Sequence, residues 1–154
     1  MGRARVGGAL EGGGGPPVRS ELLGAHCGKL TRMLDTLSSI LQVIVGLGLL
    51  NVWLVRARSA TAYRGGDSED LKAEFAAYGL PPVAFYVVGG LKITAGILLI
   101  AGLWFGDVVI PAASVVAILM VGALAMHAKV GDPPIKSLPA LLMLLMGTTI
   151  CFAP

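Results

Sequence analysis

This sequence is poor in charge and in cysteine, and it lacks the short motifs that mark common enzymes. Only 14% of its 154 residues are charged, whereas soluble domains usually carry about 25%. Its two cysteines form no Cys-x-x-Cys pair, so neither a thiol oxidoreductase site nor a zinc site is expected. A Walker loop, an HExxH motif and a serine-centred elbow are also missing. We therefore expect no metal, no cofactor and no catalytic residue, and a non-enzymatic role is favoured.

Long apolar runs stand in place of these motifs. Hydrophobic residues make up 55% of the chain and gather at 36–55, 82–105, 108–126 and 138–153. Runs of about 20 residues match a hydrocarbon layer of about 30 Å, and the fourth run would cover about 24 Å. We predict an all-α, multi-pass integral membrane protein whose four spans form an antiparallel four-helix bundle in the lipid bilayer.

The beginning of the chain has a different composition. A tract rich in glycine and proline occupies 7–17, and such a tract buries too little apolar surface to offset its ordering entropy. Residues 1–32 are predicted to be a disordered tail, and residues 33–154 the four-span membrane domain. Because Met33 stands just before the first run, one explanation is that the functional protein starts there and the tail is an upstream extension of the reading frame.

The polar segment between the first two runs is predicted to hold a short amphipathic helix. Asp67 and Ser68 can cap it, acidic residues occupy its first turn, and Gly79 ends it. Its apolar face consists of Leu71, Phe75 and Tyr78. We expect this helix to lie on the membrane surface or over the end of the bundle, the alternative being a plain helical linker.

The second and third runs are joined by a tight turn at Gly106 and Asp107. Asp107 is expected to cap the third helix, and Pro111 is tolerated in its first turn. The two helices must therefore be antiparallel neighbours. Small residues that permit close helix approach share one face of the second helix with Lys92: Gly89, Ala95 and Gly96. Lys92 is thus expected to point into the bundle rather than at lipid.

Lys92 is the only charged residue in the run 82–105. It lies roughly 14 Å into that run, near the middle of the hydrocarbon layer, where a charge marks a functional site by default. The spans place no carboxylate at its depth, because their aspartates lie at span ends. Polar residues of the first and fourth spans come within about 10 Å of the same level: Gln42, Asn51, Thr148 and Thr149. These four and Lys92 form a candidate ligand or partner site.

Three interpretations of Lys92 stay open at this point. The ammonium can snorkel to an edge or a water pocket as a structural feature. It can belong to a polar site for a quinone, a lipid head group or a small anion. It can also contact an acidic residue of another membrane protein.

A second candidate site lies at the end of the third run, where His127, Lys129 and Asp132 fall within six residues. Imidazole, ammonium and carboxylate together could form a proton-active or anion-binding mouth. The alternative is a hydrated hairpin, because Gly-Asp-Pro-Pro at 131–134 is typical of a turn.

Positive residues predict which side the connections face. Most of them outside the tail lie in the first and third connections, and such residues favour the cytoplasm, so we expect loops one and three there. The net charge of +3 comes mainly from the tail and the membrane flanks and has no interleaved aromatics, so no nucleic-acid partner is expected.

Several segments resemble the DoxX-like family of small four-helix membrane proteins. The resemblance covers about residues 36–152 and rests on NVWLVR at 51–56, AYRGG at 62–66, EFAAYGLP at 74–81, GLK at 90–92 and AGILL at 95–99. His127 followed by Val-Gly-Asp-Pro at 130–133 also resembles the third loop of a distant relative, the nicotinic acetylcholine receptor chaperone.

The resemblance implies an antiparallel four-helix bundle and a choice between two kinds of role. Some relatives are membrane subunits of redox systems, including thiosulfate:quinone oxidoreductase, whereas the chaperone relative assists receptor assembly. Our expectation is a non-enzymatic membrane subunit or accessory factor. The alternative is a redox-system component that binds a quinone-like or small anionic ligand around Lys92, and a pocket that reaches Lys92 would favour it.

Overall fold

A computed structural model of the chain describes residues 19–152. The chain divides into two units, residues 1–33 and 34–154, and each is considered by itself. The first helix begins at Arg19, so residues 19–32 are helical rather than part of a disordered tail; residues 1–18 lie outside the described residues. The glycine and proline tract ends at 17, and the segment after it contains good helix formers such as Leu22 and Leu23.

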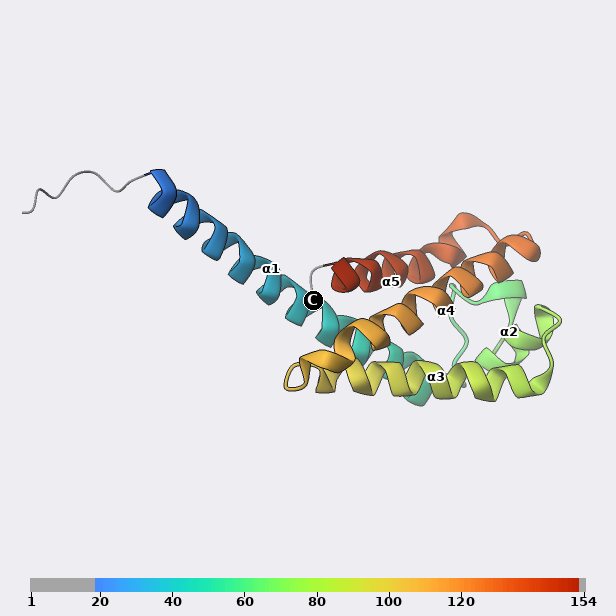
Figure 1. Cartoon of the computed structure of the whole chain (residues 1–154). Helices are drawn as coiled ribbons and strands as arrows, with labels where there is room; N and C mark the ends of the chain where they lie inside the picture. Colours follow the sequence, from blue (N-terminus) through green and yellow to red (C-terminus); the bar gives the residue numbers. More distant parts are fainter. Residues whose placement is uncertain (1–18, 153–154) are drawn as a thin grey trace, which may run out of the picture. The chain divides into compact units, whose positions relative to one another are not determined.

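The described residues form helices joined by loops, without strands (Figure 1). The long helices are α1 (Arg19–Leu50), α3 (Pro82–Ala101), α4 (Val109–Lys129) and α5 (Pro134–Phe152), and α2 (Leu71–Ala77) is short. A π-helical turn, η1 (Asn51–Val55), continues α1, and 3-10 turns occur at η2 (Gly65–Asp67) and η3 (Gly106–Val108).

Four of these helices are long and apolar enough to cross a membrane, which confirms the prediction of four spans. They are Glu21–Val55, Pro82–Ala101, Gly106–Lys129 and Pro134–Phe152. The first, third and fourth begin before the apolar runs, because a helix continues through polar end residues that a hydrophobic run excludes, and the second ends at Ala101 rather than 105. The predicted end of the fourth span, at 153, lies outside the described residues. The protein is an integral membrane protein with a helical bundle.

The bundle core lies where α3, α4, α5 and the part of α1 from residue 34 onward meet. The α4 helix packs against both α3 and α5, which confirms that the second and third spans are neighbours. The buried core comprises Val45, Leu49, Ala95, Leu99, Val109, Ala112, Ala113, Val116, Met120 and Ile150. Large apolar residues such as Ile97 and Ile118 are exposed on the outer faces, as expected of helices surrounded by lipid.

Helices α1 and α3 come close together at Gly46 and Gly96. A Cβ added to Gly46 would lie 2.8 Å from the carbonyl oxygen of Gly96, and one added to Gly96 would lie 3.1 Å from the carbonyl oxygen of Gly46. The small-residue face of the second span thus meets the first span here, rather than only the third. Two glycines facing each other let the backbones come this close.

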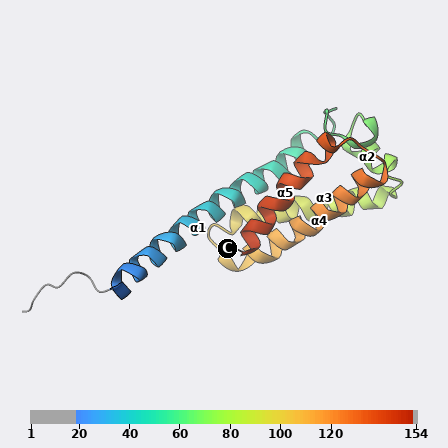
Figure 2. The same cartoon turned by 90° about the horizontal axis from the view of Figure 1, so that it is seen from above.

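The short helix α2 lies at the end of the bundle where α4 leads into α5 (Figures 1 and 2). Its N-cap is Asp70, whose side chain accepts a hydrogen bond from the Ala73 N–H over 2.6 Å. Asp67 and Ser68, the expected cap, belong to the preceding turn instead, where the Ser68 hydroxyl donates to the Gly65 carbonyl oxygen. Gly79, with a φ of 73°, ends the helix as expected.

The turn between α3 and α4 differs from its prediction in one detail. A 3-10 turn at Gly106–Val108 precedes α4, and Val108 occupies the N-cap without a side-chain hydrogen bond. Asp107 therefore does not cap α4. The 3-10 turn moves the start of α4 to Val109, so Asp107 falls inside the turn rather than at the cap position.

Candidate functional site

A cavity of about 320 Å³ lies next to Lys92, between the bundle helices and the loop and short helix that follow η1. Its polar lining includes Arg56, Arg64, Glu74, Lys92, His127 and Lys136. Apolar side chains form much of the remainder, among them Leu49, Val52, Trp53, Met120 and Met143. The cavity is therefore amphipathic, with charged and hydrogen-bonding groups set against a hydrophobic wall.

Together with Tyr63, Trp53 provides the aromatic surface of this cavity. It lies in the π-helical turn that continues α1, where the Arg56 N–H bonds to the Asn51 carbonyl oxygen over 2.9 Å. Such a turn shifts the following side chains relative to a regular helix and is frequent at functional sites. The Nζ of Lys92 lies 5.5 Å from the centroid of the Trp53 ring, a cation–π distance. Lys92 thus has an aromatic partner from the neighbouring helix.

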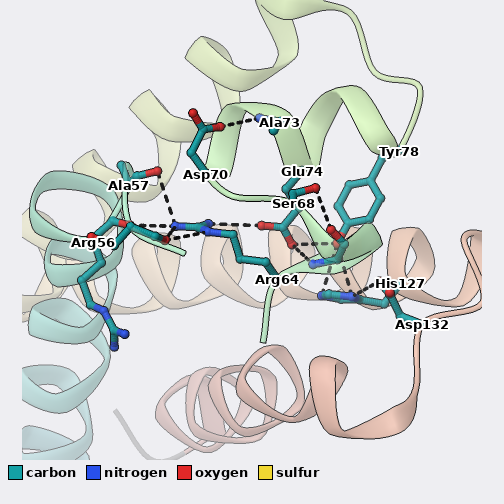
Figure 3. Close-up of polar contacts among 12 residues, drawn as sticks. Arg56, Ala57, Arg64, Ser68, Asp70, Ala73, Glu74, Tyr78, His127 and Asp132 are labelled. Atoms are coloured by element: carbon teal, nitrogen blue, oxygen red, sulfur yellow. Dashed lines mark hydrogen bonds and ion pairs between the residues drawn. The ribbon is translucent and has the colours of Figure 1, made fainter. Parts of the chain in front are cut away.

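In the cavity wall, Arg64 and Glu74 form a buried ion pair. The Nη1 of Arg64 lies 3.3 Å from Glu74 Oε2, and both side chains are at most 10% exposed. The Nη2 of Arg64 also donates to the carbonyl oxygens of Arg56 and Ser59 over 2.7 and 2.8 Å. The guanidinium therefore neutralises the carboxylate and holds the loop after η1 against α2 (Figure 3).

Glu74 continues the network toward α4. Its Oε1 accepts the Gly65 N–H over 3.0 Å and the Tyr78 hydroxyl over 2.8 Å. The Tyr78 oxygen lies 3.2 Å from Nδ1 and 3.4 Å from Nε2 of His127. Burial raises the pKa of Tyr78 far above its usual value, and the hydrogen bond to Glu74 adds to this. Tyr78 is therefore a neutral hydroxyl at any physiological pH.

His127 is also held by Asp132. Its Nδ1 lies 2.9 Å from Asp132 Oδ2, while Asp132 Oδ1 accepts the Gly66 N–H over 3.1 Å. Burial would raise the pKa of Asp132, but the hydrogen bonds from His127 and Gly66 and the nearby Lys136 charge outweigh it and lower the pKa. Asp132 is therefore ionised and orients the imidazole.

Lys136 connects this network to the loop surface. Its Nζ lies 3.5 Å from Asp132 Oδ1 and 2.7 Å from Asp67 Oδ1, and the Asp67 side chain is 95% exposed. Residues of η2, α2, the α4–α5 connection and α5 are thereby joined. The network runs from the cavity wall to water.

The residues predicted to accompany Lys92 lie elsewhere. Gln42 is buried in α1, where its Nε2 donates to the Ser38 hydroxyl and its Oε1 has no hydrogen-bond partner. Asn51 is exposed, and Thr148 and Thr149 donate to carbonyl oxygens of their own helix. The cavity lining includes Lys92 but none of these four. Equal depth along a helix did not bring them to the same side of the bundle.

Two residues of the second candidate site are in contact, and the third reaches α2. His127 bonds to Asp132, and Lys129 Nζ donates to the Tyr78 carbonyl oxygen over 3.0 Å. The end of α4 is thus tied to Tyr78 of the α2 end, about fifty residues earlier in the chain. Among residues 19–152, no group of three or more His, Cys, Asp or Glu side chains could hold a metal ion.

Sequence reasoning missed Arg64, Glu74 and the roles of Tyr78 and Trp53. Depth along the spans could not identify Glu74 as a neighbour of Lys92, because Glu74 lies on the connecting helix α2. A signal was available: Glu74 falls three residues after Leu71 and four before Tyr78. A carboxylate within an apolar helical stripe predicts a buried partner.

Comparison with known proteins places the chain in a family. Residues 47–149 match the DoxX-like family, and because this is most of the chain, the protein belongs to that family. The matched range includes the cavity lining, the short helix α2 and the whole hydrogen-bond network. No curated protein and no solved structure matches the chain.

Proposed function

We propose that this DoxX-like protein is a non-enzymatic membrane subunit that binds a small quinone-like molecule in the cavity beside Lys92. The observation that carries the proposal is an amphipathic cavity of about 320 Å³ with Lys92 and Trp53 in its wall. Ligand pockets of about 300–1,000 Å³ are usually apolar with a few placed polar groups. The cavity has this character.

The chemistry of the lining fits a ring with oxygen acceptors. The Lys92 ammonium can donate to a ring oxygen, and the Trp53 face can pack against the ring. Met120 and Met143 offer adaptable apolar surface for ring substituents or a tail. Each part of a quinone-like molecule therefore has a complementary group.

Two other roles compete with this one. An accessory or assembly factor needs no ligand, and a filled bundle core would have favoured it; the cavity supports ligand binding instead. A contact between Lys92 and an acidic residue of a partner membrane protein is the third interpretation. The placement of loops one and three on the cytoplasmic side stays a prediction.

Quenching of tryptophan fluorescence tests the proposal directly. The chain has two tryptophans, so Trp104→Phe leaves Trp53 as the only reporter. Titration with duroquinone should quench Trp53 and saturate. Lys92→Met keeps the volume but removes the donor, and affinity should fall about 10- to 100-fold, the equivalent of a hydrogen bond to a charged group. Lys72→Met, at an exposed position on α2, is the matched control and should bind normally.

The same variants separate the competing roles. Lys92→Met should leave thermal stability in detergent unchanged or higher, because an unpaired charge in a membrane is costly. Absence of saturable quenching in the Trp104→Phe protein would contradict the proposal. Loss of a copurifying protein from Lys92→Met, with duroquinone binding intact, would favour the partner contact instead.

A further inference from the structure

We propose that Glu74, Tyr78 and His127 form a proton relay that accepts a proton from a hydroxyl group of the bound ligand. The inference rests on the proposed binding of a quinone-like molecule, because a quinone carries hydroxyl groups only in its reduced form. It adds a chemical role to three side chains that would otherwise only join the connections of the bundle. It also explains why a network that contacts the cavity includes a tyrosine between an acid and an imidazole.

The three side chains form one run of hydrogen-bond contacts (Figure 3). The Tyr78 hydroxyl donates to Glu74 Oε1 over 2.8 Å, and its oxygen lies 3.2 Å from Nδ1 and 3.4 Å from Nε2 of His127. Glu74, Tyr78 and His127 are 8%, 6% and 6% exposed, so bulk water does not compete along the run. Glu74 and His127 both line the cavity, and a ligand oxygen near Lys92 would face the acid end.

The transfer can be written with every proton assigned. Before it, Glu74 is a carboxylate, Tyr78 is neutral, and His127 is neutral with its proton on Nδ1. The ligand O–H bond breaks and the proton bonds to a carboxylate oxygen of Glu74. Glu74 then gives that proton to the Tyr78 oxygen while the original Tyr78 proton moves to His127 Nε2. The products are a ligand oxyanion, a restored carboxylate, a neutral tyrosine and an imidazolium.

The surrounding charges match these products. Lys92 lines the same cavity as the ligand and can stabilise the oxyanion, while ionised Asp132 lies 2.9 Å from His127 Nδ1 and stabilises the imidazolium. The raised pKa of Tyr78 keeps its hydroxyl neutral, so it can accept and donate in one step. The charged groups around the relay are Arg56, Arg64, Lys92, Lys129, Asp132 and Lys136.

Asp132 is a positioning residue in this scheme. It accepts from the Gly66 N–H and contacts Lys136, which in turn bonds to the exposed Asp67. The imidazole is thereby held with Nδ1 2.9 Å from Asp132, while both of its nitrogens lie within 3.4 Å of the Tyr78 oxygen. The same contacts place the relay next to the water-exposed loop, where the proton can leave His127.

Nitrogen NMR of His127 is the direct test. The chain contains only two histidines. In histidine-labelled full-length protein with His26→Asn, all histidine signals therefore come from His127. At fixed pH, durohydroquinone kept under anaerobic conditions should shift these signals from the neutral to the imidazolium form. Duroquinone, which has no hydroxyl proton, should bind without this shift and serves as the matched ligand control.

Tyr78→Phe separates a relay from a structural network. Durohydroquinone should still bind and quench Trp53, but the shift of His127 to the imidazolium should be lost. Tyr86→Phe, at an exposed position of α3, is the control and should behave as the parent. If Tyr78→Phe does not fold, Glu74→Gln tests the same path, because it removes the first proton acceptor while keeping side-chain size.

The outcomes distinguish the relay from the binding proposal. Full protonation of His127 in Tyr78→Phe or in Glu74→Gln would overturn the relay, as would durohydroquinone binding to the parent protein without any shift. Absence of saturable Trp53 quenching by either ligand would overturn the binding proposal and the relay together. Binding with a shift in the parent and none in the variants supports both.

Discussion

The two ends of the α3–α4 pair differ sharply in chemistry. At the end that carries α2, Arg64, Glu74 and His127 are buried and joined by hydrogen bonds to distant parts of the chain. At the other end, the turn after α3 exposes Trp104 and Phe105, with 73% and 68% of their surface accessible. One end is a buried polar network, and the other is an exposed aromatic turn.

The two ends therefore suit different environments. Exposed aromatic rings suit the membrane interface, where an apolar body meets polar head groups. Arg64 and Glu74 are buried as an ion pair, which offsets part of a desolvation cost of several kcal/mol for each ion. We therefore expect the polar end to be sensitive to single substitutions and the aromatic end to be tolerant, which three experiments can test.

The largest effect is expected for Arg64→Met. Removing the guanidinium leaves Glu74 buried without its ion-pair partner and frees the carbonyl oxygens of Arg56 and Ser59. The expected loss of stability is about 3–5 kcal/mol, measured by unfolding in detergent, with faster proteolysis of the loop. Arg58→Met, at an exposed position of the same loop, is the control. Equal stability of the two variants would show that the buried pair does not hold this end together.

An intermediate effect is expected for Gly65→Ala. The added Cβ would lie 2.0 Å from the Tyr78 hydroxyl oxygen, so either the tyrosine or the loop must move. Overpacking of this kind costs about 1–3 kcal/mol. Gly106→Ala tests the aromatic end, where the added Cβ would have no atom within 4 Å, and its effect should stay within about 0.5 kcal/mol. Thermal unfolding of the two variants compares the ends directly, and a larger loss for Gly106→Ala would reverse the comparison.

The smallest effect is expected from mild acid. Because the pKa of Asp132 is lowered in the folded protein, the unfolded chain binds the proton more tightly, and stability falls as the pH drops through and below about 4. Asp132→Asn should flatten this decline, whereas Asp107→Asn, at an exposed position of the aromatic end, should leave it unchanged. Melting temperatures between neutral and acid pH give the slopes. Parallel slopes for all three proteins would mean that Asp132 makes no such contribution.

Prediction from sequence succeeded where one-dimensional patterns decide the outcome. The four apolar runs became the four long helices, and the segment after the first span formed its short helix, ended by Gly79. Predictions that needed exact local hydrogen bonding were less accurate. Asp70 rather than Asp67 caps α2, and Asp107 caps no helix, because turns that precede each helix shift its start by a few residues.

The same distinction between local pattern and tertiary packing applies to the two candidate sites. His127 and Asp132 are five residues apart, so their contact follows from one turn of chain. Gln42 and Thr148 were grouped with Lys92 by depth alone, and depth does not specify the direction in which a side chain points. Glu74 could not be placed beside the cavity from the sequence, because its position depends on how α2 folds back against α3.

The amino-acid sequence by itself determined that this protein is a helical membrane protein, since hydrocarbon requires apolar runs of bilayer length with internally satisfied backbones. It also determined that Lys92 would be unusual, because a lone charge in such a run is costly. Only the tertiary structure decided which groups surround that charge. Trp53 reaches it from a π-helical turn, and Glu74 and His127 line the same cavity from α2 and α4. Such partners are set by helix rotation and by the docking of a connecting helix, and neither leaves a periodic signal in the sequence.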